Sequence, residues 1–312
     1  MQIPWTFVRG HRAARAGLVA GGGQPLPASR NMPYRPLGRT GHQCSVVTLG
    51  GRAVSHLPQA AVNELVAEML DAGVNCVDVA PTYEDSEALL GEALRGKRDR
   101  VFLCGKTTCR DKAGAAAELR QSLSRLQTDH LDLYQLHSPE TRAALRQVLA
   151  PGGALEACLE AREAGLIRFI GLTGHYPRVL LRGLRSFAFD TVQLPFNLVS
   201  DFYNGFGRQL LAEAQRRQLG VLTVKTLAAR NRRPGEPHLR PNTNYYPFTD
   251  PAEISLAVRY SLRQPAITTL PTISDPGLAR QMLAAALNYT PLTPEELAQA
   301  HQLARRQPVW FH

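Results

Sequence analysis

The alternation of short apolar segments with amphipathic segments constrains the fold of this chain more than any other feature. From residue 46 onward, short apolar runs alternate with stretches whose apolar residues recur at helical spacing, and Gly or Pro marks many of the changes. We predict strands over 46–51, 74–79, 101–105, 131–136, 167–172, 191–194, 221–224 and 267–270. We predict helices over 59–72, 84–95, 113–126, 153–164, 177–186, 206–218, 251–263, 276–287 and 295–306.

Eight strand–helix units in about 240 residues predict an α/β fold of the (β/α)8 TIM-barrel type. Strands that are joined by helices pair in parallel through crossover connections. A hairpin from residue 34 to 46, turning at Gly38–Gly41, is predicted to plug the N-terminal mouth, and the helix over 295–306 is an extra C-terminal element. The rival is an open doubly wound sheet, which usually carries a Gly-rich phosphate loop after its first strand. Gly50-Gly51-Arg52-Ala53 lacks that spacing, so we favour the barrel.

Residues 1–31 differ in composition from the rest of the chain. They are rich in Gly, Arg and Pro and show little periodicity. We interpret them as a flexible extension or as the product of a start codon assigned too far upstream, because Met32 precedes the first structured pattern. A targeting segment is an alternative, although Gly21–Gly23 and the nearby prolines interrupt any sustained amphipathic helix. Residues 32–312 then form a single barrel domain.

The charge distribution argues against a nucleic-acid partner. Residues 1–63 contain seven Arg and no Lys, Asp or Glu, so they carry most of the net charge of +10. A nucleic-acid-binding surface would cluster basic residues with aromatic ones or show a known motif, and neither is evident. No apolar run approaches the ~20 residues of a membrane span, so we expect no membrane partner.

The cysteines indicate neither a disulfide framework nor a metal site. There are five, an odd number, without CxxC spacing. We therefore expect reduced thiols in an intracellular, cytoplasmic protein. Cys104 and Cys109 are close in sequence, but no further Cys or His cluster completes a set of four ligands, so we predict no metal.

Reactive side chains follow three consecutive predicted strands. Asp78, Lys106 and His137 lie at or just beyond strand ends, and Tyr83 follows Asp78 by five residues. Each residue alone has a structural explanation, as a capping acid, a solvated Lys, a packed His or an aromatic at the start of a helix. Their coincidence at the carboxyl ends of parallel strands, where α/β folds place their sites, favours a shared active site.

The chemistry of these four groups suits protonation of a carbonyl oxygen. A phenol with a pKa of about 10 is a weak acid, and a nearby ammonium group makes it a better proton donor. A buried ammonium group needs an anionic partner, which Asp78 can supply, and His137 can hydrogen-bond a substrate oxygen. The set contains no nucleophile–base pair. Side chains do not supply hydride, so a nicotinamide cofactor is implied.

From about residue 32 to 306 the chain resembles the aldo-keto reductase family. The stretches that carry the resemblance are 34–41, 73–83, 102–106, 132–137, 170–173 and 291–297. The resemblance implies an NAD(P)H-dependent carbonyl reductase without a Rossmann domain, in which Asp78, Tyr83, Lys106 and His137 match the catalytic tetrad. Tyr83 then protonates the carbonyl as C4 of the nicotinamide gives hydride, and the reverse reaction oxidises an alcohol.

The resemblance also implies cofactor contacts, with several departures from the family pattern. Thr173-Gly174 stands where the family usually has Ser-Asn, and Val224 stands where a stacking Tyr is common. Arg280 is a candidate for a 2′-phosphate, but its register is shifted. We favour NADP(H) over NAD(H). The candidate cofactor-binding residues are Gly50, Gly51, Thr173, Gln193, Val224, Lys225, Thr272, Ser274 and Arg280.

Three functional hypotheses follow. The first is an oxidoreductase that reduces a small-molecule aldehyde or ketone, or oxidises the alcohol, with sugars among the candidates. The second is a cofactor-binding redox sensor or regulatory barrel with little turnover, and the third is a barrel lyase or isomerase. The loop over 228–249 is expected to be a solvated excursion or a lid walled by Tyr245, Tyr246 and Phe248. Gly174–Tyr176 and Phe202–Tyr203 are further candidates for the pocket border. The oligomeric state is left open.

Overall fold

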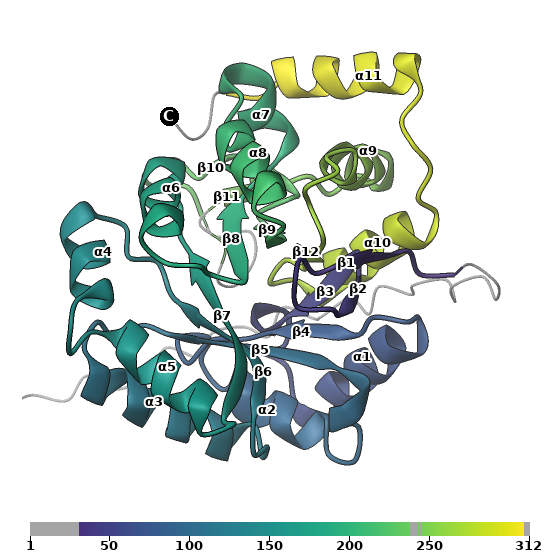
Figure 1. Ribbon diagram of the computed structural model, residues 1–312. Helices are drawn as coiled ribbons and strands as arrows, with labels where there is room; N and C mark the ends of the chain where they lie inside the picture. The colour runs from purple at the N-terminus through teal and green to yellow at the C-terminus, as the bar shows by residue number, and fades with distance from the viewer. Residues whose placement is uncertain (1–30, 238–242, 244, 309–312) are drawn as a thin grey trace, which may run out of the picture.

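Eight parallel strands form the central sheet of the computed structural model, which describes residues 31–237, 243 and 245–308. Their order is β12-β3-β4-β5-β6-β7-β8-β9. The strands are β3 (Val47–Gly50), β4 (Cys76–Asp78), β5 (Phe102–Thr107), β6 (Leu131–Leu136), β7 (Ile167–Thr173), β8 (Thr191–Pro195), β9 (Gly220–Val224) and β12 (Leu270–Pro271). The two sheet edges meet where the Thr268 amide donates to the Val221 carbonyl at 2.9 Å and Leu222 bridges Thr269. The predicted TIM barrel is confirmed (Figure 1).

Helices connect the strands and cover the outside of the sheet (Figure 1). They are α1 (Gln59–Asp71), α2 (Ser86–Ala93), α3 (Lys112–Arg125), α4 (Arg142–Leu149), α5 (Ala154–Glu163), α6 (Pro177–Ser186), α7 (Leu198–Asn204), α8 (Arg208–Arg216), α9 (Pro251–Leu262), α10 (Pro276–Leu287) and α11 (Pro294–Arg305), with two 3-10 turns, η1 (Gly51–Ala53) and η2 (Arg98–Arg100). Two short helices, α4 and α7, were not predicted from the sequence; eight and seven residues establish a helical period only weakly, although α2, which is equally short, was predicted.

A two-stranded hairpin closes the N-terminal end of the barrel, as predicted. It pairs β1 (Tyr34–Pro36) with β2 (Gln43–Ser45). Leu37 is fully buried in a small apolar cluster inside the barrel, and the His42 ring stacks on Phe102 with centroids 4.6 Å apart. Arg39 fixes the hairpin to the rim by donating to the Ala188 carbonyl at 2.7 Å. With this end filled by side chains, the opposite end is left for a ligand.

Residues 228–249 are not a structureless loop. Strands β10 (Ala228–Asn231) and β11 (Tyr245–Pro247) pair in antiparallel fashion outside the barrel sheet. Phe248 is buried in the core, and Tyr246 packs against Arg230, whose guanidinium carbon lies 3.9 Å from the ring centroid. The predicted solvated excursion is therefore wrong for β10 and β11, whose backbone pairing and apolar side chains tie them to the barrel, whereas most of residues 232–237 are exposed.

The last helix, α11, packs against α7 and α9. It begins with a capping box in which the Thr293 hydroxyl accepts from the Glu296 amide and the Glu296 carboxylate accepts from the Thr293 amide. Arg259 of α9 clamps the same carboxylate through two hydrogen bonds of 2.6 and 2.7 Å. The extra C-terminal helix is thus part of the packed domain.

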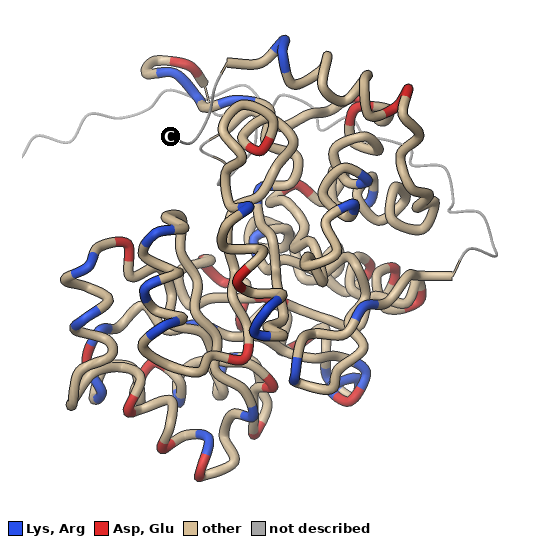
Figure 2. The backbone as a smooth tube through the Cα atoms, turned by 45° about the horizontal axis from the view of Figure 1, so that its top comes forward, with Lys and Arg blue, Asp and Glu red and all other residues tan. Residues whose placement is uncertain are grey.

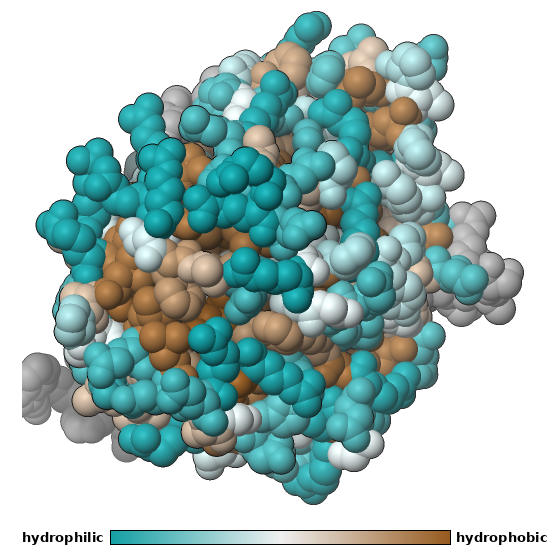
Figure 3. Space-filling view, viewed as in Figure 1, coloured by the Kyte–Doolittle hydropathy of each residue, from teal (hydrophilic) through white to brown (hydrophobic). Residues whose placement is uncertain are grey.

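The surface and the thiols bear on the other sequence predictions. Charges of both signs are dispersed over the tube in Figure 2, and hydrophilic side chains frame the apolar groups on the face seen in Figure 3. None of the described helices is long and apolar enough to cross a bilayer.

The five cysteines are free, and the described residues contain no cluster of three or more metal-ligating side chains. The predicted N-terminal extension over 1–31 lies, except for its last residue, outside the described residues.

Two glycines of the hairpin turn allow its contact with the barrel to be tested. Gly38 has a φ of +53°, and a Cβ there would lie 2.2 Å from the Gly220 nitrogen, whereas Gly41 has a φ of +78° with no atom within 4 Å of its Cβ position. We expect Gly38→Ala to lower the free energy of unfolding by about 3 kcal/mol or more, since it adds a backbone clash to the strained φ. Gly41→Ala should cost only about 1 kcal/mol. Equal losses in urea unfolding would show that the hairpin does not seat tightly on β9.

Candidate active site

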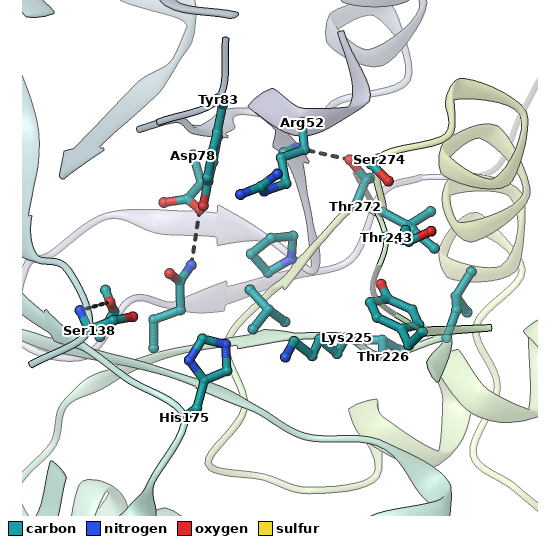
Figure 4. Close-up of a pocket in the computed structure, with 18 of the residues that line it drawn as sticks. Arg52, Asp78, Tyr83, Ser138, His175, Lys225, Thr226, Thr243, Thr272 and Ser274 are labelled. Atoms are coloured by element: carbon teal, nitrogen blue, oxygen red, sulfur yellow. Dashed lines mark hydrogen bonds between the residues drawn. The ribbon is translucent and has the colours of Figure 1, made fainter. Parts of the chain in front are cut away.

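A cavity of about 720 Å³ opens at the carboxyl ends of the barrel strands. Such a volume is typical of small-molecule and cofactor sites. Its wall includes ten of the residues predicted from the sequence, namely Gly50, Asp78, Tyr83, His137, Thr173, Gln193, Val224, Lys225, Thr272 and Ser274. Lys106, Gly51 and Arg280 are not on the wall. Figure 4 shows that the labelled side chains reach the same space from both the early and the late strands.

A buried ion pair lies beneath the cavity floor. Lys106 of β5 donates from Nζ to Asp78 Oδ2 at 2.6 Å, and both side chains are almost completely buried. Burial is the largest single effect and lowers the pKa of Lys106, but the charge and hydrogen bond of Asp78, together with the charges of Tyr83 and Cys104, outweigh it, so the pKa of Lys106 is raised. Lys106 therefore remains an ammonium group in a dry environment.

Two side-chain amides complete the contacts of Asp78. Gln135 of β6 donates to Oδ1 at 2.9 Å, and Gln193 of β8 donates to Oδ2 at 3.0 Å. A buried carboxylate is tolerated only when its oxygens are paired, and here every partner comes from a different strand of the barrel. Asp78 and Lys106 lie on the adjacent strands β4 and β5, whereas Gln193 reaches Asp78 from β8, so the full set of contacts forms only in the curled sheet.

Tyr83 lies at the same mouth of the barrel, as predicted. It follows β4 in a turn in which its amide donates to the Ala80 carbonyl at 3.0 Å. The Lys106 Nζ is 5.2 Å from the Tyr83 ring centroid, and the His137 ring stands edge-on with centroids 6.3 Å apart. The guanidinium carbon of Arg52 lies 4.3 Å from the same ring centroid. Two cations and an imidazole thus surround the phenol.

His137 is held at the end of β6 by its backbone. Its amide donates to the Thr107 carbonyl at 2.9 Å, and its carbonyl accepts from Arg110 at 2.8 Å. The residue is partly buried, and its Nδ1 atom, which is shielded from solvent, has no hydrogen-bond partner among the described residues. Burial, reinforced by the charge of Lys106, lowers the pKa of His137 to about 3. The imidazole is therefore neutral near pH 7 and has one N–H to donate.

The candidate cofactor residues are arranged around the remaining wall. The Gly50 amide donates to the Thr272 hydroxyl at 2.9 Å, and a Cβ on Gly50 would lie 2.6 Å from the Thr272 carbonyl oxygen, so β3 and β12 approach closely here. Thr173 accepts at its hydroxyl from the Ser138 amide at 3.0 Å. Lys225 follows β9 with a φ of +65°, which residues with side chains rarely adopt. Burial lowers the pKa of Lys225 to about 8.

Two predicted cofactor residues lie elsewhere. Arg280 leaves α10 toward α1 and donates to Glu68 through hydrogen bonds of 2.6 and 3.1 Å, so it is outside the cavity wall. Gly51 begins η1 behind the wall, where a Cβ would lie 2.8 Å from the Val79 side chain. The register of α10 directs Arg280 away from the cavity. Close packing against the end of β4 explains why residue 51 is a glycine.

Of the border candidates, only some reach the cavity. Gly174, His175, Tyr176 and Tyr245 line it. Tyr246 and Phe248 do not, and neither do Phe202 and Tyr203; the Tyr203 hydroxyl instead donates to the Gln307 carbonyl at 3.0 Å, beyond the end of α11.

The sequence analysis missed two charged residues on the wall. Arg52 follows β3, and Glu140 follows β6 three residues after His137. Glu140 accepts from the His175 amide at 3.1 Å and contacts His175 Nδ1 at 2.6 Å. The rule that residues beyond strand ends face the site predicts both, but Arg52 entered the sequence argument only within Gly50-Gly51-Arg52-Ala53, which lacks the spacing of a phosphate loop.

The Asp78–Lys106 pair can be tested by removing one charge. Lys106→Met leaves Asp78 buried without a counter-ion, and we expect the free energy of unfolding to fall by about 3–5 kcal/mol. The double variant Asp78→Asn/Lys106→Met should be more stable than the single one, because a neutral amide needs no counter-ion. A loss below about 1 kcal/mol for Lys106→Met in urea unfolding would contradict the buried pair.

The neutral state of His137 predicts a pH dependence of stability. Its pKa of about 3 lies below the ordinary value of 6.5, so between these values the unfolded chain binds the proton more readily. The associated stability is complete above pH 6.5 and is lost as the pH falls. Between pH 7 and pH 5 the wild type should lose about 2 kcal/mol more than His137→Gln. A titration midpoint near 6.5 for the His137 ring in NMR would contradict this expectation.

Comparisons with known proteins bear on the family and the fold. The family model described as "Aldo/keto reductase family" matches residues 46–231. Aldo-keto reductase YhdN of Bacillus subtilis is 31% identical over 187 residues, which cover 54% of this chain and 54% of that protein. Methylglyoxal reductase YeaE of Escherichia coli is 39% identical over 93 residues, covering 27% of this chain and 33% of that protein. The matched region spans about half the length, or less, of these curated relatives.

Solved structures extend the likeness over most of the chain. The holo form of aldo-keto reductase AKR11C1 from Bacillus halodurans has a TM-score of 0.70 at 23% identity, covering 90% of this chain and 98% of that one. An aldo-keto reductase from Klebsiella pneumoniae in complex with NADPH has a TM-score of 0.65 at 26% identity, covering 91% of this chain and 97% of that one. Since the family model matches more than half of the chain, this protein belongs to the aldo/keto reductase family.

Proposed function

We propose that this protein is an NAD(P)H-dependent oxidoreductase that reduces an aldehyde or ketone, or oxidises the corresponding alcohol, with Tyr83 as general acid and base. The observation that carries the proposal is the position of the Tyr83 ring, between the Lys106 ammonium at 5.2 Å and the His137 imidazole at 6.3 Å. The family membership supports the reaction class.

The residues present fit a nicotinamide dinucleotide. Gln193 donates its amide nitrogen to Asp78, and among the described residues no donor contacts its side-chain oxygen, which is left to accept from a carboxamide. Lys225 and the hydroxyls of Thr226, Thr272 and Ser274 lie beyond the last two strands, where TIM barrels commonly bind phosphate. A bound reduced nicotinamide would supply the hydride.

The roles of the side chains follow from their contacts. The substrate carbonyl oxygen accepts from the Tyr83 hydroxyl and from the neutral His137 ring, which orient it in the cavity. As charge develops on that oxygen, Tyr83 transfers its proton, and Lys106 stabilises the phenolate that remains. Asp78, held by Gln135 and Gln193, keeps the Lys106 ammonium fixed below the phenol. The same groups run in reverse when an alcohol is oxidised.

We further propose NADP(H) rather than NAD(H) as the cofactor. The support is the cationic Lys225 on the phosphate side of the cavity and the NADPH complex of the similar Klebsiella enzyme. Arg280, which the sequence suggested for the 2′-phosphate, is engaged by Glu68 and contributes nothing to this preference.

Removal of the Tyr83 hydroxyl oxygen tests catalysis and cofactor binding separately. We expect Tyr83→Phe to lower carbonyl reduction by about 100- to 10,000-fold, because the general acid is lost, while the Kd for NADPH stays within about twofold. The measurements are NADPH and NADH titrations by protein fluorescence and reduced-cofactor oxidation with a panel of aldehydes and ketones.

Each hypothesis gives a different result in that experiment. Tight NADPH binding by the wild type without turnover across the panel would favour the redox-sensor alternative. Absence of binding to either nucleotide would reject nicotinamide chemistry. A Tyr83→Phe variant that loses turnover and cofactor binding in parallel would show that Tyr83 is not the proton donor.

A further inference from the structure

The two acidic side chains on the cavity wall are already engaged. Asp78 pairs with Lys106 and accepts from two side-chain amides. Glu140 accepts from the backbone amide and lies 2.6 Å from the ring nitrogen of His175. Hydrogen bonding to His175 overcomes the effect of burial and lowers the pKa of Glu140. Both carboxylates are thus engaged by other groups, and neither forms an ion pair with Arg52.

Positive charge is present on the same wall. Arg52 and Lys225 both line the cavity. Figure 4 shows the guanidinium end of Arg52 pointing toward Tyr83 and the ammonium end of Lys225 extending toward His175. In the part of the chain that the structure describes, Arg52 forms no ion pair with a carboxylate, and its guanidinium group rests on the Tyr83 ring at 4.3 Å. A guanidinium group that lies over a ring can still donate from the N–H groups at its edge. Two of these N–H groups match the two oxygens of a carboxylate.

We propose that Arg52 selects substrates that carry a carboxylate next to the reacting carbonyl, so that the preferred substrates are 2-oxo acids or the matching 2-hydroxy acids. This inference rests on the proposed function, because it takes Tyr83 as the proton donor. A carbonyl oxygen at the Tyr83 hydroxyl brings a substituent one bond away within reach of a guanidinium group stacked on the same ring. A carboxylate several bonds away would extend past it.

The reaction on such a substrate is balanced. A bound reduced nicotinamide would supply the hydride that the keto carbon gains, and the keto oxygen gains the Tyr83 proton, giving a 2-hydroxy acid, after which the Tyr83 phenolate takes up a proton from water. The carboxylate stays unchanged and bound to Arg52. His175, held by Glu140, lies on the same wall and can donate a second hydrogen bond to the carboxylate or to a hydroxyl beside it. Arg52 is thus a specificity-determining residue rather than a member of the proton-transfer set.

The test compares charged and neutral ligands on Arg52→Gln, Arg52→Lys and a matched control. Arg185→Gln is the control, since it removes the same charge from an exposed position on α6. The first readout is kcat/KM for pyruvate and phenylglyoxylate against their methyl esters. The second, which needs no turnover, is calorimetric binding of oxamate and of neutral oxamide to the NADPH-loaded protein. NADPH affinity and thermal unfolding are measured for every variant.

We expect Arg52→Gln to lower the acid-to-ester ratio of kcat/KM by roughly 10- to 100-fold, mostly through KM, and to weaken oxamate binding by a similar factor without changing that of oxamide. Arg52→Lys should restore part of the ratio, and Arg185→Gln should match the wild type. The NADPH Kd should be unchanged in all three variants.

Several results would overturn the inference. A wild type that reduces esters efficiently with a ratio unaffected by Arg52→Gln would reject the carboxylate site while leaving the carbonyl reductase intact. Loss of NADPH affinity in Arg52→Gln, with an unchanged ratio, would assign Arg52 to the cofactor instead. Arg52-dependent oxamate binding without turnover of any carbonyl would support the anion site and reject the proposed reductase activity.

Discussion

The buried ion pair between Asp78 and Lys106 is the interaction on which the rest of the site depends. Two opposite charges withdrawn from water are stable only when each finds its partner and the remaining lone pairs are satisfied. Here Gln135 and Gln193 supply those bonds, so β4, β5, β6 and β8 must all be in register. The curl of the sheet, which brings Gln193 of β8 to Asp78 of β4, is therefore coupled to the charge state of the barrel floor. The ion pair also explains how the Lys106 ammonium group remains charged, although it is shielded from solvent and lies close to the Tyr83 phenol.

The two ends of the barrel carry out different tasks. The N-terminal end is filled by the hairpin, through the buried Leu37 and the stack of His42 on Phe102. The carboxyl end is left open, and its wall is polar where strands stop and their loops begin. Because of this separation, energetically unfavourable features lie at the open end, where ligand binding can offset their cost. They are the buried charge of Lys106 and the positive φ of Lys225.

The acidic and basic side chains on the cavity wall differ in how they are paired, which bears on substrate specificity. The two acids on the cavity wall, Asp78 and Glu140, contact Lys106 and His175, whereas Arg52 lies over the Tyr83 ring. His137 is kept neutral by burial and by the neighbouring Lys106, so it can orient an oxygen without adding charge. The positive charges of Lys106 and Arg52, which help burial to keep His137 neutral, also make the cavity favourable for an anionic ligand.

The sequence by itself determined the barrel, the hairpin plug and the four residues of the proposed tetrad. Hydrophobic period and strand-end position are local properties, and parallel pairing then brings Asp78, Tyr83, Lys106 and His137 to one mouth. Only the tertiary structure decided that Gln135 and Gln193 converge on Asp78, that Arg280 turns to Glu68, and that Arg52 lies over Tyr83. These outcomes depend on strand register, helix rotation and side-chain direction across segments far apart in the chain. No local pattern encodes them, because they are fixed only when the barrel closes and the charges find their partners.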